Sequence, residues 1–215
     1  MNENATKPQA SLPILERSIK FYRKNKNLIF LALTFIIIII SSFIYYSNYK
    51  ESEKIKIADN YIHAKILLSN GETDEGKKIL KEIIYLNDST YSSIALFLIL
   101  NEGIETDNKE IDNLFEHLLK NNNFESEVKN LIIFKKALFQ SNELSELELL
   151  EMLKPIITKN TLWKPHALLL LGNHFVHKKE YLKAKEFFME ILSLKNLNKD
   201  FYDQANLQLS SIAND

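Results

Sequence analysis

A long apolar run near the N-terminus dominates the hydropathy pattern of the chain. Residues 28–46 carry no charged side chain over nineteen positions. At 1.5 Å rise per residue, a helix of this length spans roughly 28 Å, close to the thickness of a bilayer's hydrocarbon core. Tyrosines and a phenylalanine flank the run, as is usual at the two interfaces of a membrane. The pattern predicts one transmembrane helix rather than a buried helix of a soluble domain.

A cleavable signal peptide is the main alternative for this run. Signal peptides have an apolar region of about 7–15 residues followed by a site of small residues. Here the run is longer, 27 residues precede it, and bulky residues at positions 43–46 follow Ser41 and Ser42. The sequence therefore favours an uncleaved anchor.

The rest of the chain has the three- and four-residue apolar spacing of amphipathic helices. Ile57, Tyr61, Ala64 and Leu68 form the first such stripe. Residues with helix-capping side chains lie between the stripes: Thr73, Asp88, Asp107 followed by Glu110, and Ser145 followed by Glu148. No segment alternates with period two for long enough to be a strand. We expect helices at 49–70, 73–87, 89–102, 108–120, 124–141, 145–158, 163–178, 180–194 and 199–213.

Short links between these helices suggest antiparallel hairpins, and the hairpins have a repeating pattern. The offsets of the tetratricopeptide motif are matched by Leu168, Leu171, Gly172, Phe175, Ala184, Phe188 and Ile191. Part of the pattern recurs at Ala64, Leu67, Gly76, Leu80 and Ile83. We predict an all-α fold: one N-terminal transmembrane helix, then a tetratricopeptide-like α-solenoid of about four hairpins plus a C-terminal cap helix. A plain helical bundle is the alternative.

Charge divides the chain into zones that agree with this organisation. Residues 1–27 hold six basic and two acidic side chains, a net charge of +4, although the whole chain has −1. We predict a basic cytoplasmic tail at 1–27, a transmembrane helix at 28–46 and a tetratricopeptide-like domain at 47–215. The ten residues before the span hold four basic residues and the ten after it hold three, so charge alone favours an internal N-terminus only slightly.

Composition excludes several kinds of chemistry. The chain has no cysteine, which removes disulfides, thiolate metal sites and thiol nucleophiles. Its four glycines are too few for glycine-rich nucleotide loops, and a net charge near zero gives no reason to expect nucleic acid as a partner. His174 and His177 are three apart on a predicted helix, but no nearby carboxylate completes a metal site. We expect no catalytic residue, metal, cofactor or small-molecule substrate, and hence no enzyme.

Three segments resemble one bacterial family, the ancillary subunits of the Sec translocon. They are the helix around Ala58-Asp-Asn-Tyr61, the Tyr91-Ser-Ser-Ile-Ala95 helix, and the Leu162-Trp163-Lys-Pro-His-Ala167 entrance to the best repeat. The resemblance covers about residues 14–213. It implies a single-pass protein of the bacterial inner membrane with a cytoplasmic N-terminus and a periplasmic tetratricopeptide-like domain. Its implied partners are the translocon, periplasmic chaperones and unfolded secreted chains.

Two further functions remain open from the sequence: a scaffold for cell-envelope assembly, such as the division or peptidoglycan machinery, and an enzyme hidden in a helical fold. If the chain is a scaffold, the first helix of each hairpin lines the concave face. The motif offsets then predict exposed partner-binding residues at Tyr61, Lys65, Leu68, His166, Leu169, Asn173, Val176 and His177. The alternative is that Leu68, Leu169 and Val176 pack against a neighbouring repeat or a cap helix.

Overall fold

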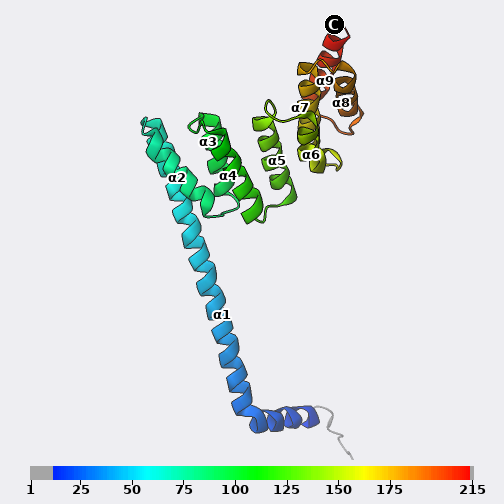
Figure 1. Cartoon of the computed structure of the whole chain (residues 1–215). Coiled ribbons are helices and arrows are strands. Elements are labelled where there is room, and N and C mark those ends of the chain that lie inside the picture. Colours follow the sequence, from blue (N-terminus) through cyan, green and yellow to red (C-terminus); the bar gives the residue numbers. More distant parts are fainter. Residues whose placement is uncertain (1–11, 214–215) are drawn as a thin grey trace, which may run out of the picture. The chain divides into compact units, whose positions relative to one another are not determined.

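The computed structural model describes residues 12–213, with side chains described from Ser18 onward. Residues 1–11 of the predicted basic tail, and residues 214–215 of the predicted C-terminal domain, lie outside the described residues. Within 12–213 the chain is helical, with nine helices and no strand (Figure 1). The helices are α1 (Leu12–Ser69), α2 (Thr73–Tyr85), α3 (Tyr91–Glu102), α4 (Asn108–Asn121), α5 (Ser126–Gln140), α6 (Glu146–Ile157), α7 (Lys164–His177), α8 (Tyr181–Ser193) and α9 (Lys199–Ile212).

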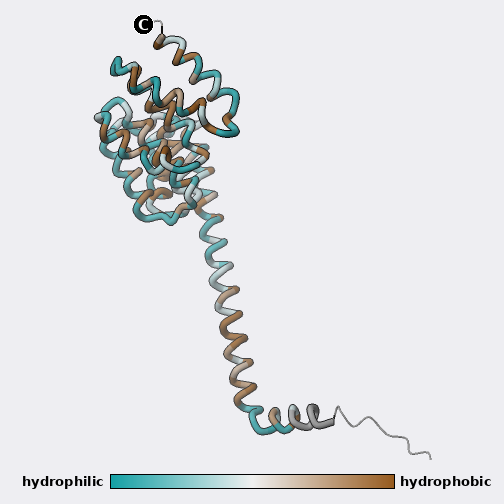
Figure 2. The backbone as a smooth tube through the Cα atoms, turned by 90° about the vertical axis from the view of Figure 1, so that its right-hand side faces the viewer, coloured by the Kyte–Doolittle hydropathy of each residue, from teal (hydrophilic) through white to brown (hydrophobic). Residues whose placement is uncertain are grey.

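The chain forms two compact units, residues 1–56 and residues 57–215. In the first unit, α1 contains an 18-residue window of mean hydropathy 2.8, none of which is buried (Figure 2). This helix is long enough and apolar enough to cross a membrane. We expected a new helix to begin at residue 49, but α1 continues through this point and departs from helical geometry only at Asn25.

In the second unit, consecutive helices bury their apolar stripes in three connected clusters. The first cluster joins the end of α1 to α2, α3, α4 and α5, and Phe115 is one of its fully buried side chains. The second joins α5, α6 and α7, and the third joins α7, α8 and α9 around Phe175 and Phe188. Leu150 and Phe187 pack against both of the last two clusters, so the core continues from one to the next.

Two glycines mark places where helices of a hairpin approach closely. A Cβ at Gly172 on α7 would lie 2.4 Å from Cε1 of Phe188 on α8. A Cβ at Gly76 on α2 would lie 2.7 Å from Cδ2 of Leu68 and 3.2 Å from the Ala64 carbonyl oxygen on α1. Only glycine leaves room for these contacts, as the repeat offsets predicted for Gly172. The side chain beside Gly172 is Phe188, a large residue of the same repeat pattern.

The predicted helix starts are confirmed only in part. The Ser145 hydroxyl and the Glu148 carboxylate form the expected capping box at α6. Asp107 caps α4 by accepting a hydrogen bond from the Lys109 N–H, but Glu110 completes no box, because its carboxylate bonds Lys81 on α2 instead. At α2 the prediction of a Thr73 cap is wrong, because Thr73 is the first helical residue and follows Glu72.

Candidate functional site

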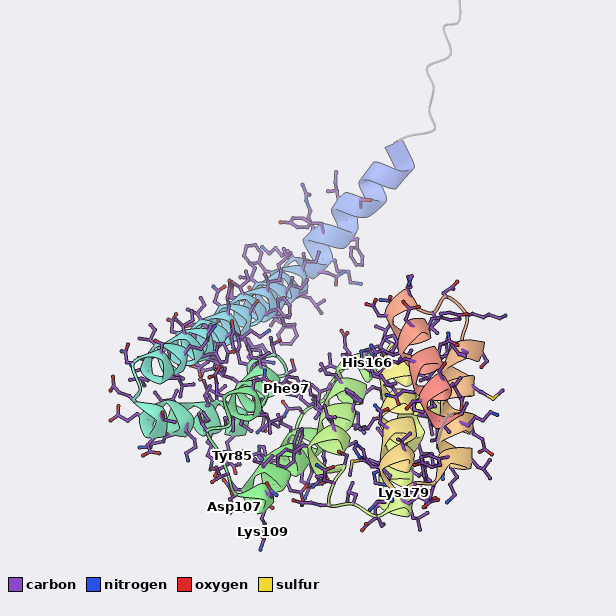
Figure 3. All side chains as sticks on the ribbon, turned by 90° about the horizontal axis from the view of Figure 1, so that it is seen from above. Tyr85, Phe97, Asp107, Lys109, His166 and Lys179 are labelled. Carbon is purple, nitrogen blue, oxygen red and sulfur yellow. The ribbon has the colours of Figure 1, made fainter. Side chains whose placement is uncertain are left out.

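Helices α3, α5 and α7 carry two cavities in the second unit. The first, which we call the apolar cavity, has a volume of about 170 Å³. Its lining comes from α3 and α5: Phe97, Leu100, Asn101, Lys135, Leu138 and Phe139. The Lys135 ammonium lies 5.9 Å from the centre of the Phe97 ring, which Figure 3 labels on α3. An apolar floor with one cation at its edge suits an aliphatic or aromatic side chain of a partner.

The second cavity, which we call the polar cavity, has a volume of about 300 Å³. It lies between the C-terminal end of α5 and the last two turns of α7. Its lining offers hydrogen-bonding groups around one leucine: Ser141, Asn142, Leu170, Asn173, His174, His177 and Lys178. Amides and imidazoles can both donate and accept hydrogen bonds, so this lining matches the alternating N–H and C=O groups of a polypeptide backbone.

His174 is the polar group of this cavity whose hydrogen bonds are incomplete. The residue is 7% exposed, and its Nδ1 lies 3.2 Å from the Ser141 carbonyl oxygen. Because a carbonyl only accepts, Nδ1 carries the proton and donates, which leaves Nε2 of a neutral ring as an acceptor. Nε2 is buried and has no hydrogen-bond partner among the described residues. A buried acceptor without a donor is costly to the folded state.

The two cavities share the last turns of α5. Leu138 and Phe139 line the apolar cavity, and Ser141 at the end of the same helix lines the polar cavity. Both cavities therefore lie at the C-terminal end of α5. We call the two cavities and the α5 residues between them the α3–α5–α7 surface.

The structure brings two of the predicted binding residues to this surface. Asn173 and His177 both line the polar cavity, next to His174. Sequence reasoning paired His174 with His177 as weak candidates for a metal site. They do share a cavity, but no group of three or more His, Cys, Asp or Glu residues that could hold a metal occurs among the described residues.

The other predicted binding residues lie elsewhere, and most are covered by neighbouring helices. The Tyr61 ring packs 5.9 Å from the Tyr91 ring, and its burial raises the pKa of its hydroxyl. Leu169 and Val176 pack in the cluster that α9 completes, and Leu68 packs against Gly76. These four side chains are half-buried, which agrees with the packing alternative for Leu68, Leu169 and Val176. Lys65 is exposed, as expected.

His166, at the start of α7, lies among aromatic rings. Its ring centre is 4.9 Å from that of Trp163, 5.6 Å from Phe134 and 4.6 Å from Phe201 on α9. Burial lowers the pKa of the imidazole, because the charged form loses its hydration. His166 thus joins α5, α7 and α9, and this position serves packing more directly than partner binding.

Two ion-pair networks hold neighbouring helices, and sequence reasoning found neither of them. The Lys81 ammonium on α2 pairs with Glu105 at 2.7 Å and with Glu110 at 2.9 Å. The buried Lys136 on α5 pairs with Asp112, at 2.8 Å, and Glu116 on α4. The partners are 20 or more residues apart in the chain, so local spacing gives no signal for them.

Comparisons with protein-family models, curated proteins and solved structures gave no match for this chain. The functional interpretation therefore rests on the residues and geometry of the chain itself.

Proposed function

We propose that this protein is a non-enzymatic, membrane-tethered interaction scaffold, similar to an ancillary subunit of the Sec translocon that links secreted chains to periplasmic chaperones. Two features support the proposal: a helix long and apolar enough to cross a membrane, and the α3–α5–α7 surface. The apolar helix would hold the α3–α5–α7 surface next to a membrane channel.

A tetratricopeptide-like solenoid is the architecture that we propose for the second unit. Its support is strongest in the C-terminal half, where α7 packs against α8 within its hairpin and also against α5 and α9. First helices of successive hairpins then contact one another, which generates a curved stack. The close approach of Gly172 to Phe188 supports the same assignment. In the N-terminal half, α2 contacts α4, so the stacking there is less regular.

The observation that carries the proposed function is the hydrogen-bonding lining of the polar cavity. The cavity offers the Asn173 amide and the His177 imidazole as hydrogen-bonding groups, and Leu170 adds an apolar contact. An extended polypeptide presents an N–H donor at every residue except proline, whatever its sequence. A site that recognises main-chain groups therefore binds unfolded chains without requiring one sequence, as a factor for secreted proteins must.

We further propose that the protein lies in the bacterial inner membrane, with residues 1–27 in the cytoplasm and the second unit in the periplasm. The excess of basic residues before the span supports this orientation. In the oxidising periplasm a chain without cysteine is free of unwanted disulfides. A scaffold for cell-envelope assembly would have the same anchor and the same surface, and it would differ in its partners.

Crosslinking in intact membranes distinguishes the two scaffolds. The full-length protein, tagged at its C-terminus, is crosslinked in cells, purified under denaturing conditions and analysed by mass spectrometry. A matched variant carries His174→Phe and Asn173→Ala, which remove hydrogen-bonding groups from the polar cavity. We expect channel subunits, periplasmic chaperones and secretory precursors, all reduced in the variant. Recovery of division or peptidoglycan proteins would support the alternative, and identical recovery from both proteins would contradict binding at this surface.

A further inference from the structure

The N-terminal part of α1 has a feature that the scaffold function does not use. The helix departs from helical geometry at Asn25, where φ is −116° and ψ is 15°, and residues before this point are helical again. Figure 1 shows the chain changing direction at this bend. A helix that turns at the edge of an apolar span leaves the axis of the span. It can then follow the membrane surface.

The residues before the bend have a charged side and an apolar side. On a helix of 3.6 residues per turn, all charged positions of residues 12–24 fall within about 120° of the circumference. Four of these are basic and one is acidic: Arg17, Lys20, Arg23, Lys24 and Glu16. Apart from Pro13, the apolar and aromatic positions of the same segment occupy the remaining arc. This is the pattern of a basic amphipathic helix.

Large side chains of the apolar side are exposed in the part of the chain that the structure describes. Ile19 is 47% exposed, Phe21 is 64% exposed and Tyr22 is 54% exposed. Ile19 and Tyr22 lie about 60° apart on the helix, and large exposed side chains on one side indicate a surface that something else covers. The lipid bilayer is the candidate for this cover. The proposed span, residues 28–46, begins four positions after Lys24 and would hold Ile19 and Tyr22 at the headgroup level of the bilayer. The basic side fits anionic headgroups.

We propose that residues 12–24 form an interfacial helix, with Ile19 and Tyr22 against the acyl chains and Lys20 and Lys24 toward anionic phospholipid headgroups. The inference rests on the proposal that residues 28–46 cross the membrane. It adds a second contact between protein and membrane, which resists rotation and tilting of the span. The occupant is the lipid surface itself, in the leaflet that faces the N-terminus.

The absence of cysteine makes a direct test possible, since each introduced cysteine is unique. The full chain is placed in nanodiscs of phosphatidylcholine and phosphatidylglycerol. An environment-sensitive NBD dye is attached at Ile19→Cys, Lys20→Cys, Tyr22→Cys, Lys24→Cys or, as a control in the span, Ile37→Cys. We expect NBD at positions 19 and 22 to be blue-shifted and quenched at least twofold more by doxyl-labelled lipid than NBD at positions 20 and 24. Equal quenching on both sides, or water-like emission at all four positions, would overturn the interfacial helix.

The control in the span separates this inference from the proposal on which it rests. If NBD at position 37 is shielded and NBD at position 19 is not, the transmembrane helix stands and the interfacial helix fails. If NBD at position 37 is also exposed to water, the span itself fails. Nanodiscs of phosphatidylcholine alone test the headgroup contact. We expect the quenching at positions 19 and 22 to fall at least twofold in them, and unchanged quenching would contradict a role for anionic lipid.

Discussion

The Phe188 ring on α8 lies so close to Gly172 on α7 that a methyl group at Gly172 would overlap it, at 2.4 Å from Cε1. Phe188 is fully buried, so its ring has no free space into which it can turn. Because overpacking of a filled core is costly, Gly172→Ala should reduce the free energy of unfolding by about 1–3 kcal/mol, and Gly172→Leu by more. Urea unfolding of the full chain in detergent, followed by the fluorescence of the single tryptophan, Trp163, measures this change.

A double-mutant cycle with Phe188→Leu provides the control for this prediction. Leucine lacks the ring atoms that would collide, so Gly172→Ala should cost less in this background, with a coupling energy of about 0.5–3 kcal/mol. If Gly172→Ala lowers the free energy of unfolding equally in both backgrounds, the Phe188 ring is not what excludes a side chain at position 172.

His166 should make the second unit sensitive to mild acid. Burial among Phe134, Trp163 and Phe201 lowers the pKa of its imidazole below the ordinary value of 6.5, so the unfolded chain binds a proton more readily than the folded chain does. The free energy of unfolding is therefore not reduced by His166 above about pH 6.5, and it decreases as the pH falls toward the lowered pKa. Thermal melting followed by circular dichroism between pH 7.5 and 5 should show this decrease in the wild-type protein.

His166→Phe removes the titrating group while keeping an aromatic ring, so the decrease in stability between pH 7.5 and 5 should become smaller. His63→Gln, a substitution at an exposed histidine of α1, is the matched control and should leave the decrease unchanged. An equal decrease in stability between pH 7.5 and 5 in the wild-type protein and in His166→Phe would mean that another group causes it.

Glu105 should stabilise the junction between α3 and α4 down to low pH. Its hydrogen bond with the Lys81 ammonium, together with bonds from the backbone N–H groups of Thr106 and Asp107, lowers the pKa of its carboxyl group to about 2. The folded pKa lies below that of the unfolded chain. The stabilisation is therefore fully present above about pH 4.5 and is lost as the pH falls toward 2.

Glu105→Gln should therefore lower the free energy of unfolding at pH 7 by about 1–3 kcal/mol, since Lys81 loses a charged partner. The difference from wild type should shrink at pH 3. Glu102→Gln, at an exposed position on α3, is the control and should change stability by less than about 0.5 kcal/mol. A difference that stays constant from pH 7 to pH 3 would contradict the charge-based explanation.

The sequence predicted local features well and long-range contacts poorly. Apolar spacing located eight of the helices to within about two residues at most ends, and the Ser145–Glu148 box was visible because both groups are three residues apart. Glu110 looked like the same motif, but its carboxylate binds Lys81, which is 29 residues away. No proline or glycine marks the bend at Asn25, so no local signal announced it.

The same distinction explains the outcome for the candidate site. Repeat offsets placed Asn173 and His177 on one side of α7, and both line the polar cavity. They could not show that Leu169 and Val176 pack against the cluster that α7, α8 and α9 form, because a single helix's periodicity identifies its apolar face but not its neighbour. The apolar cavity was missed entirely, since the predicted binding residues lay only on the first helix of the chain and on α7.

The orientation of the anchor can be tested with a reporter enzyme. Alkaline phosphatase, which is active only outside the cytoplasm, should be active when fused to the C-terminus of the chain. The same reporter fused after Lys26, before the apolar span, should be inactive. Both fusions must be present in similar amounts on an immunoblot, and the opposite pattern of activity would reverse the proposed topology.

Site-specific photo-crosslinking in cells tests the central claim, that partners bind the α3–α5–α7 surface, most directly. A photoreactive amino acid replaces Leu138 or His177 on this surface, Tyr61 or Leu169 at predicted binding positions outside it, or Lys185, an exposed residue of α8. We predict that positions 138 and 177 capture secretory precursors or chaperones at least several-fold more than position 185, with weak capture at the half-buried positions 61 and 169. Equal capture at positions 138, 177 and 185 would contradict the claim.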